Sequence, residues 1–235
     1  MNSEKYINLV PSAGGSFSFG WRKMFEKAFL PLLVTVIIVG LLDGPTIGAN
    51  WKWDENFSPG AALFLVPLAL FSLAYGFLFM PVIKYGERFV FLKAIRDEEA
   101  DLRLLFEGFK TKYLNIVLAH LIVTALTILG FVMLIIPGII VACRLVFVPL
   151  LVMDKDLDPM KAVEKSWELT RGHGWQIFAM IILSFFVAIA GLIVMFVGVI
   201  ISVIWIHAAF ASMYQAILNQ SDEDNPIPIL GVNEL

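Results

Sequence analysis

The sequence predicts an all-α integral membrane protein with six transmembrane helices arranged as three hairpins, and an amphipathic inner-surface helix before each hairpin. Three observations lead to this fold class. Hydrophobic residues make up 59% of the 235 residues and charged residues only 16%, against about 25% charged residues in a soluble domain. Six apolar stretches are separated by polar segments. Basic residues gather in alternate polar segments, as they do in multi-pass membrane proteins.

Each apolar stretch is expected to form one membrane-spanning helix, because about 20 helical residues cross ~30 Å of hydrocarbon. Residues 1–218 would then form a single membrane domain, and the acidic, proline-containing segment 219–235 is expected to be disordered. The predicted spans cover approximately residues 25–42, 61–83, 113–136, 138–153, 175–196 and 199–218.

Two of the predicted helix boundaries depend on turn residues. The stretch 113–153 is too long for one span, and its only interruption is Pro137-Gly138, so we expect a turn there. This pair of helices either crosses the membrane twice or forms a re-entrant pair. Gly191 and Gly198 are the candidates for the turn between the last two spans.

The distribution of lysine and arginine predicts the orientation. These residues precede the first span, follow the second span from Lys84 and Arg88 onward, and lie between the fourth and fifth spans. The segment 43–59 has only Lys52 against three acidic residues. Because short cytoplasmic loops are enriched in Lys and Arg, we expect both termini and the two long polar segments in the cytoplasm.

Three polar segments show the spacing of amphipathic helices, and together with the hairpins they suggest a loose threefold internal repeat. Such helices, with aromatic side chains on the apolar face, lie stably at a lipid interface. The apolar stripes are Met160, Val163 and Trp167; Leu102, Leu105, Phe106 and Phe109; and, more weakly, Phe17, Trp21, Met24 and Phe25.

Several stretches together resemble a broad group of bacterial six-span membrane proteins of unknown function, which includes YciC-like inner-membrane proteins and the membrane domain fused to some glycerophosphoryl diester phosphodiesterases. The resemblance covers roughly residues 15–218 and implies a helical bundle in the bacterial cytoplasmic (inner) membrane. It implies no activity, because the phosphodiesterase chemistry belongs to a separate soluble barrel for which this sequence has no remaining residues. The similar stretches are SFSFGWRKMF, FLKAIRDEEADLRLLFEGFK, the PGI at 137–139, Arg144 followed by FVPLLVMD, and AVEKSWELTRGHGWQIF.

Arg144 is the strongest candidate for a functional side chain, because a charge inside a span usually faces a partner, the bundle interior or water. The expected partners are Asp43, His120, freed carbonyl groups near Pro137, or a lipid phosphate. A structural role for Arg144, joining helices or reaching to the interface, is the alternative. His120 and His207 are each expected to form an interhelical hydrogen bond.

Lys165, Trp167 and Arg171 are candidates for binding anionic lipid head groups at the inner membrane surface, where each basic residue contributes about 1 kcal/mol. Interfacial anchoring by Trp167 alone is the alternative. No catalytic residue, metal site or cofactor is predicted, because the sequence lacks a P-loop, HExxH, GxSxG and a Cys-His nucleophile set. Its single cysteine, Cys143, also excludes a multi-cysteine zinc site.

Three functional hypotheses follow. The first is a non-enzymatic membrane protein that organises membrane lipid or partner proteins, with a homo-oligomer as one option. The second is a small transporter or channel with an anionic site at Arg144. The third is an accessory membrane domain for lipid-modifying enzymes. The net charge of −3 gives no electrostatic signature of nucleic-acid binding.

Overall fold

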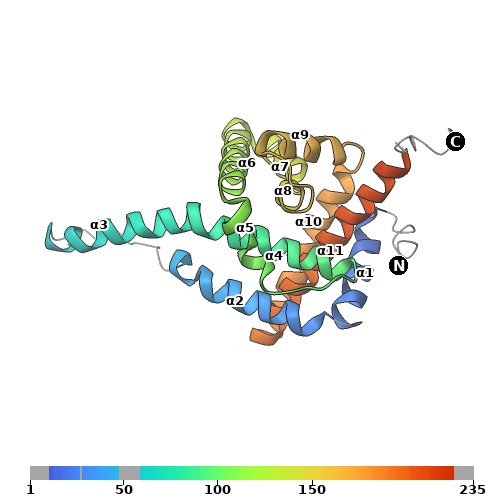
Figure 1. Cartoon of the computed structure of the whole chain (residues 1–235), viewed down its shortest axis with the longest axis horizontal. Coiled ribbons are helices and arrows are strands. Elements are labelled where there is room, and N and C mark those ends of the chain that lie inside the picture. Colours follow the sequence, from blue (N-terminus) through green and yellow to red (C-terminus); the bar gives the residue numbers. More distant parts are fainter. Residues whose placement is uncertain (1–10, 27, 48–58, 225–235) are drawn as a thin grey trace, which may run out of the picture.

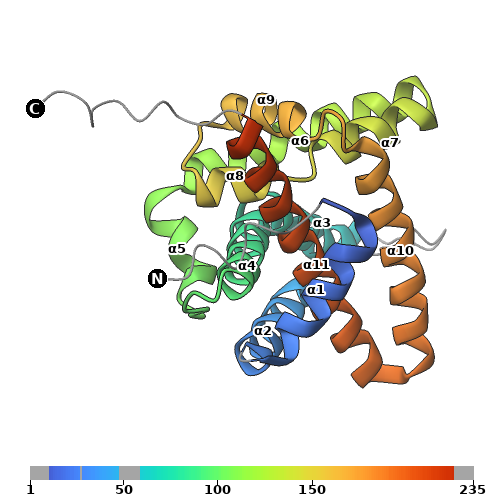
Figure 2. The ribbon, with the colours of Figure 1, turned by 90° about the vertical axis from the view of Figure 1, so that its right-hand side faces the viewer.

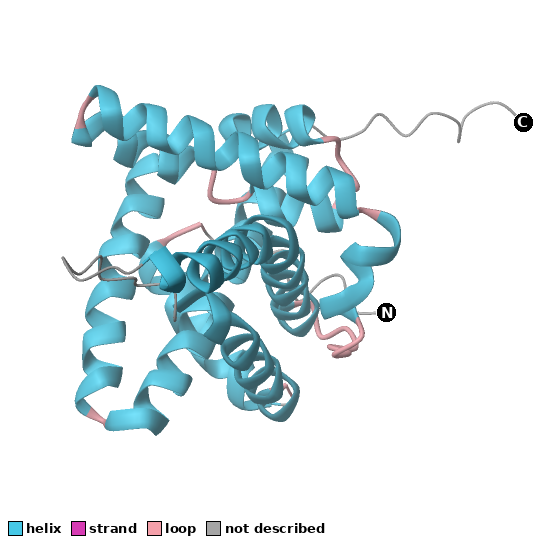
Figure 3. Cartoon of the chain, turned by 90° about the vertical axis from the view of Figure 1, so that its left-hand side faces the viewer, coloured by secondary structure: helices cyan, strands magenta, loops and turns pink. Residues whose placement is uncertain are grey.

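The computed structural model describes residues 11–26, 28–47 and 59–224, and in these ranges every regular element is a helix (Figures 1 and 3). The predicted disorder of 219–235 falls largely outside the described residues. The elements are α1 (Ala13–Glu26), α2 (Phe29–Ile47), α3 (Pro59–Ala74), the π-helical turn η2 (Tyr75–Phe79), α4 (Met80–Ile95), α5 (Leu104–Thr111), α6 (Tyr113–Met133), α7 (Ile135–Arg144), α8 (Val148–Asp154), α9 (Pro159–Leu169), α10 (Gly174–Ile193) and α11 (Met195–Asp224).

Several of these helices are long and apolar enough to cross a membrane, which confirms the prediction of an all-α chain with multiple membrane-length helices. The described residues contain five such helices, and a sixth if the strongly bent pair α1–α2 counts as one span. The five are Leu65–Ile95, Tyr113–Met133, Ile135–Asp154, Gly174–Ile193 and Val197–Ser221.

The chain divides into a buried core and three apolar arms. The core consists of α4, α8 and the C-terminal half of α11, with α1, α5 and α9 packed around them. The arms are α2 with α3, α6 with α7, and α10 with the N-terminal half of α11. At the tip of the α6–α7 arm, Val132 through Ile136 are each about 70% exposed. Apolar surface of this extent is stable in lipid but not in water.

The three arms point in different directions and do not form a parallel bundle. Helix α3 runs across Figure 1, α6 runs along the viewing direction of Figure 1 and therefore lies horizontally in Figure 2, and α10 stands upright in Figure 2. Spanning helices run within about 40° of the bilayer normal. The expected arrangement of three side-by-side hairpins is therefore not confirmed.

The turn between α6 and α7 lies at Leu134, three residues before the predicted position at Pro137-Gly138. Leu134 adopts an extended backbone, with φ −169° and ψ 157°. Pro137 instead occupies the first turn of α7, where its missing N–H leaves no helical bond unmade. Gly138 allows close packing of the two helices, because a Cβ on Gly130 would lie 3.0 Å from its Cα.

The helix that contains the second predicted span continues past residue 83, where the span was predicted to end. Helices α3, η2 and α4 follow one another without a break up to Ile95. The apolar run 89–92 is buried in the core and carries the helix past the charged residues before it. Lys84, Glu87 and Arg88 therefore lie within a membrane-length helix, where the sequence prediction had placed a polar loop.

Helices form in all three predicted amphipathic segments, but each packs a face on protein. Gly20 of α1 contacts α11 so closely that a Cβ there would lie 2.9 Å from the backbone nitrogen of Ala209. In α9, Ala162 and Ser166 are fully buried in the core. The exposed side of α9 keeps Trp167 and Met160 of the predicted apolar stripe available to lipid.

Candidate functional site

The break between α7 and α8 releases backbone carbonyl groups, and side chains from other helices bind two of them. Helix α7 ends at Arg144 and α8 begins at Val148. In this break the Leu145 and Phe147 carbonyls accept backbone N–H groups, whereas side chains bind the carbonyls of Arg144 and Val146. Ser166 Oγ of α9 donates a hydrogen bond of 2.7 Å to the Arg144 carbonyl oxygen. Arg88 Nη1 of α4 donates to the Val146 carbonyl oxygen at 3.3 Å. The break is thus a fixed feature tied to two neighbouring helices.

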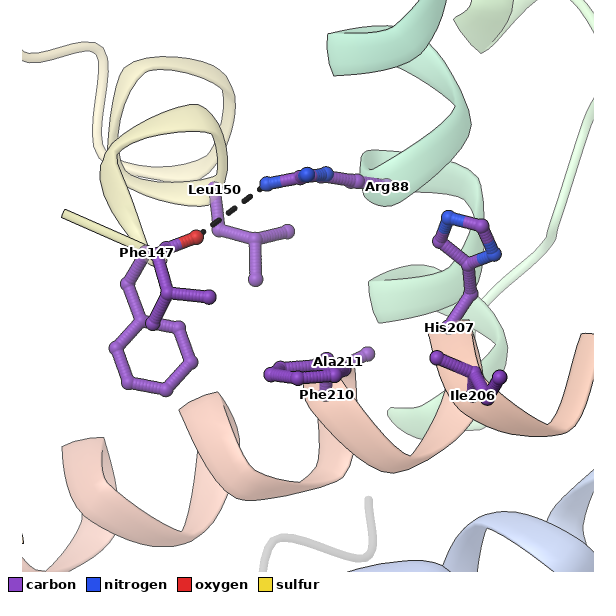
Figure 4. Close-up of a pocket in the computed structure, with 8 residues that line it drawn as sticks. Arg88, Phe147, Leu150, Ile206, His207, Phe210 and Ala211 are labelled. Carbon is purple, nitrogen blue, oxygen red and sulfur yellow. Dashed lines mark hydrogen bonds between the residues drawn. The ribbon is translucent and has the colours of Figure 1, made fainter. Parts of the chain in front are cut away.

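Arg88 and His207 lie between two cavities. The smaller cavity, of about 160 Å³, lies between α4, α8 and α11, and Figure 4 shows Arg88 and His207 beside it. The larger cavity has a volume of about 620 Å³ and lies between α2, α4 and the N-terminal half of α11. Its lining residues are Val36, Ile37, Val39, Gly40, Leu41, Asp43, Lys84, Glu87, Arg88, Val199, Ile200, Val203 and His207.

The larger cavity combines apolar walls with charged residues. Its walls are aliphatic side chains of α2 and α11, whereas α4 contributes Lys84, Glu87 and Arg88. Lys84 Nζ lies 3.2 Å from Asp43 Oδ2 and joins α4 to α2. Charged groups inside apolar helices are costly, and in membrane proteins they usually mark a binding site. This cavity is therefore the candidate site.

Glu87 is the least satisfied charged side chain in this cavity. Its exposure is only 5%. Within the described part of the chain it makes no hydrogen bond and no ion pair within 4 Å, although it interacts electrostatically with Arg88. A buried carboxylate usually has a hydrogen-bond donor or a cation as a partner. The cavity that Glu87 lines is the place from which such a partner can reach it.

The predicted candidate Arg144 lies outside the residues that line either cavity. Its guanidinium carbon is 5.8 Å from the ring centroid of Trp167, a second predicted site residue. Its Nη1 atom is buried and has no hydrogen-bond partner among the described residues. The other two candidates lie elsewhere: Asp43 pairs with Lys84, and the His120 ring is 6.3 Å from that of Phe77. The anionic site at Arg144 stays a prediction.

The predicted inner-surface candidates lie near a third hollow, of about 520 Å³, beside α9. Lys165 is among its lining residues and pairs with Glu168 at 3.1 Å. Lys155 and Lys161 also line it, together with a second glutamate. Arg171 is exposed in the turn after α9. Because both signs of charge are present, this hollow carries no strong preference for anions.

An ion-pair network holds the core helices that position the cavity. Arg96 Nη1 and Nη2 donate to both carboxylate oxygens of Asp154, at 2.5 and 2.9 Å, and Arg96 Nε donates to Gln215 at 2.7 Å. Tyr214 Oη donates to Asp154 at 3.2 Å. Burial lowers the pKa of Arg96, but its hydrogen bonds to Asp154 and the carboxylate charge outweigh that effect and raise the pKa overall. Arg96 therefore stays charged.

Sequence reasoning missed Glu87 and treated Lys84 and Arg88 as loop residues. The signal that could have found them is the apolar run 89–92, which follows within a helical turn and contains no proline. Gly86 lies in the middle of the segment. It is required for packing, because a Cβ there would lie 2.6 Å from the Leu105 carbonyl oxygen of α5.

Comparison of the chain with protein-family models, curated proteins and solved structures gives no match. The resemblance to YciC-like membrane proteins therefore stays a prediction. Among the described residues, no group of three or more His, Cys, Asp or Glu side chains could hold a metal ion.

Proposed function

We propose that this chain is a multi-pass membrane protein that binds a membrane lipid in the larger cavity and catalyses no reaction. The main observation behind this proposal is that the larger cavity combines a volume of about 620 Å³, aliphatic walls and charged residues within apolar helices. Ligand sites typically pair apolar walls with a few polar groups that fix orientation. A lipid matches this cavity, because its acyl chains suit the walls and its head group suits the charged residues.

The exposed arms support the membrane location in this proposal. Apolar tips such as that of α6–α7 require lipid. The lysine and arginine residues of the polar segments suit the cytoplasmic side. We place the protein in a bacterial inner membrane with both termini in the cytoplasm, as six spans in three hairpins. Because the arms diverge, they enter one flat bilayer only if they turn relative to the core.

Filling the cavity tests the proposal. Gly40 lines the cavity, and a Cβ added there meets no atom within 4 Å, so Gly40→Phe occupies the lipid space with little strain. Gly14→Phe is the matched control, since Gly14 is exposed in α1 and its Cβ would also be in open space. Native mass spectrometry of protein released from lipid nanodiscs reports the lipid that stays bound.

Wild type and Gly14→Phe are expected to retain lipid, and Gly40→Phe is expected to lose it. Equal lipid retention by all three proteins, or none by wild type, would refute the proposal. Thermal unfolding of each variant in detergent checks that the fold is intact.

A transporter is the second candidate, and the α7–α8 break favours it. Interrupted helices at membrane depth mark substrate sites in transporters, and here Arg88 binds a carbonyl of the break while lining both cavities. Anion uptake into proteoliposomes that is lost in Arg88→Gln would support transport. No uptake by wild type above empty liposomes would leave lipid binding alone.

A further inference from the structure

We infer that the lipid bound in this cavity is a zwitterionic phospholipid with a primary ammonium group, whose ammonium contacts Glu87 and whose phosphate contacts Arg88. The inference rests on the proposed lipid-binding function and names its ligand class. Both side chains line the larger cavity and are consecutive on α4.

Glu87 identifies the ammonium half of the ligand. Glu87 is only 5% exposed as a residue, and its carboxylate lacks a hydrogen bond or an ion pair within 4 Å among the described residues, yet it lines the cavity. A ligand in the cavity is in position to supply the missing donor. An ammonium with N–H groups provides charge and hydrogen bonds together, and such charge-assisted bonds are about twice as strong as neutral ones.

Arg88 identifies the phosphate half. Its guanidinium carries five N–H donors, of which Nη1 binds the Val146 carbonyl. The remaining donors are available in a geometry that suits phosphate oxygens. In an ethanolamine phospholipid a short ethylene unit joins the ammonium to the phosphate, so one head group carries both charges that suit a cavity lined by Glu87 and Arg88.

The charge balance of the cavity favours a zwitterion over an anion. Lys84 and Asp43 already neutralise each other across 3.2 Å, which leaves Glu87 and Arg88 as one acid and one base. A purely anionic head group would satisfy Arg88 but would place a second negative charge beside Glu87, which already interacts electrostatically with Arg88. A quaternary ammonium carries charge but has no N–H to donate to the carboxylate.

Competition among three lipids tests the inference with the full chain. Nanodiscs contain equal amounts of phosphatidylethanolamine, phosphatidylglycerol and phosphatidylcholine, and native mass spectrometry measures which lipid is retained. Wild type is expected to retain phosphatidylethanolamine preferentially. Glu87→Gln is expected to reduce that retention roughly tenfold, because a charged hydrogen bond is lost, while phosphatidylglycerol retention does not fall. Arg88→Gln is expected to reduce retention of all three lipids.

Two further variants make the result specific. Glu107→Gln is the matched control, because Glu107 is exposed on α5 and lies outside the cavity lining. Glu87→Asp keeps the charge and is expected to recover part of the preference. If Glu87→Gln fails to fold, the phosphatidylethanolamine preference of Glu87→Asp, compared with that of wild type, tests the inference in its place.

The outcomes separate this inference from the proposed function. Equal retention of the three lipids by wild type, or an unchanged preference in Glu87→Gln, would overturn the inference even if Gly40→Phe still blocks binding. No lipid on wild type, or no effect of Gly40→Phe, would overturn the proposed function itself.

Discussion

The ion pair between Arg96 and Asp154 is expected to be one of the largest single contributors to the stability of the core. Its side chains are only 17% and 7% exposed, and the carboxylate accepts two hydrogen bonds from Arg96 and one from Tyr214. Removing one partner of a buried pair leaves the other charge without compensation, which costs about 3–5 kcal/mol. Asp154→Ala should therefore lower the unfolding free energy by about 3 kcal/mol or more, roughly 6–12 °C in Tm for a chain of this size.

A double-mutant cycle separates the pair from the packing around it. The variants are Arg96→Met, Asp154→Leu and the combination, with thermal unfolding in detergent as the assay. Because an apolar pair of similar volume removes both desolvation costs, the double variant should be more stable than the sum of the two single losses predicts. Lys165–Glu168 is the control pair; its side chains are 40% and 63% exposed, so its disruption should cost no more than about 1 kcal/mol. Equal losses for the two pairs would refute the reasoning.

Two further predictions concern packing and the helix break. Gly86→Ala should be strongly destabilising, because its Cβ would lie 2.6 Å from the Leu105 carbonyl oxygen and 2.7 Å from the Leu105 Cα, and backbone atoms cannot move aside cheaply. The Tm in detergent should fall well below that of Gly14→Ala, whose Cβ meets no atom. Ser166→Ala should cost about 1 kcal/mol in thermal unfolding, because it removes the 2.7 Å hydrogen bond to the partly buried Arg144 carbonyl and leaves it only the 3.5 Å contact with Thr170 Oγ1.

The Ser166 prediction has a control within the same chain. Ser184 Oγ donates to the Met180 carbonyl oxygen, but that carbonyl lies inside the continuous helix α10, where a backbone N–H also serves it. Ser184→Ala should therefore have a much smaller effect. If Ser166→Ala and Ser184→Ala lower the Tm equally, the α7–α8 break does not depend on α9. An unaltered Tm in Gly86→Ala would contradict the close crossing of α4 and α5.

The sequence predicted the apolar helices better than their ends. Apolar length identifies a helix because every backbone polar group must be satisfied within lipid, and this signal found the helices in 113–133 and 174–193. It failed at residue 83, where Lys84 and Arg88 suggested a loop. Whether a charged residue ends a helix or lies within one depends on what packs against it, and here α5, α8 and α11 cover α4.

The turn at Leu134 shows a similar limit. Pro137 and Gly138 marked the right region, because both residues interrupt ordinary helix continuation. Their positions could not be assigned from the sequence, since proline is as well suited to the first turn of a helix as to the end of one. Contact between Gly130 and Gly138 across the two helices decided the outcome.

By itself the sequence determined the all-α fold class and the presence of several membrane-length apolar helices, because these follow from local composition and from the length that a helix needs to cross lipid. Only the tertiary structure decided which charged residues share a site. Asp43 and Glu87 are 44 positions apart, and Arg88 and His207 lie on different helices, so no local pattern links them. The packing of α2, α4 and α11 brings them to one cavity, because burial of the apolar faces of these helices fixes which polar side chains must meet there.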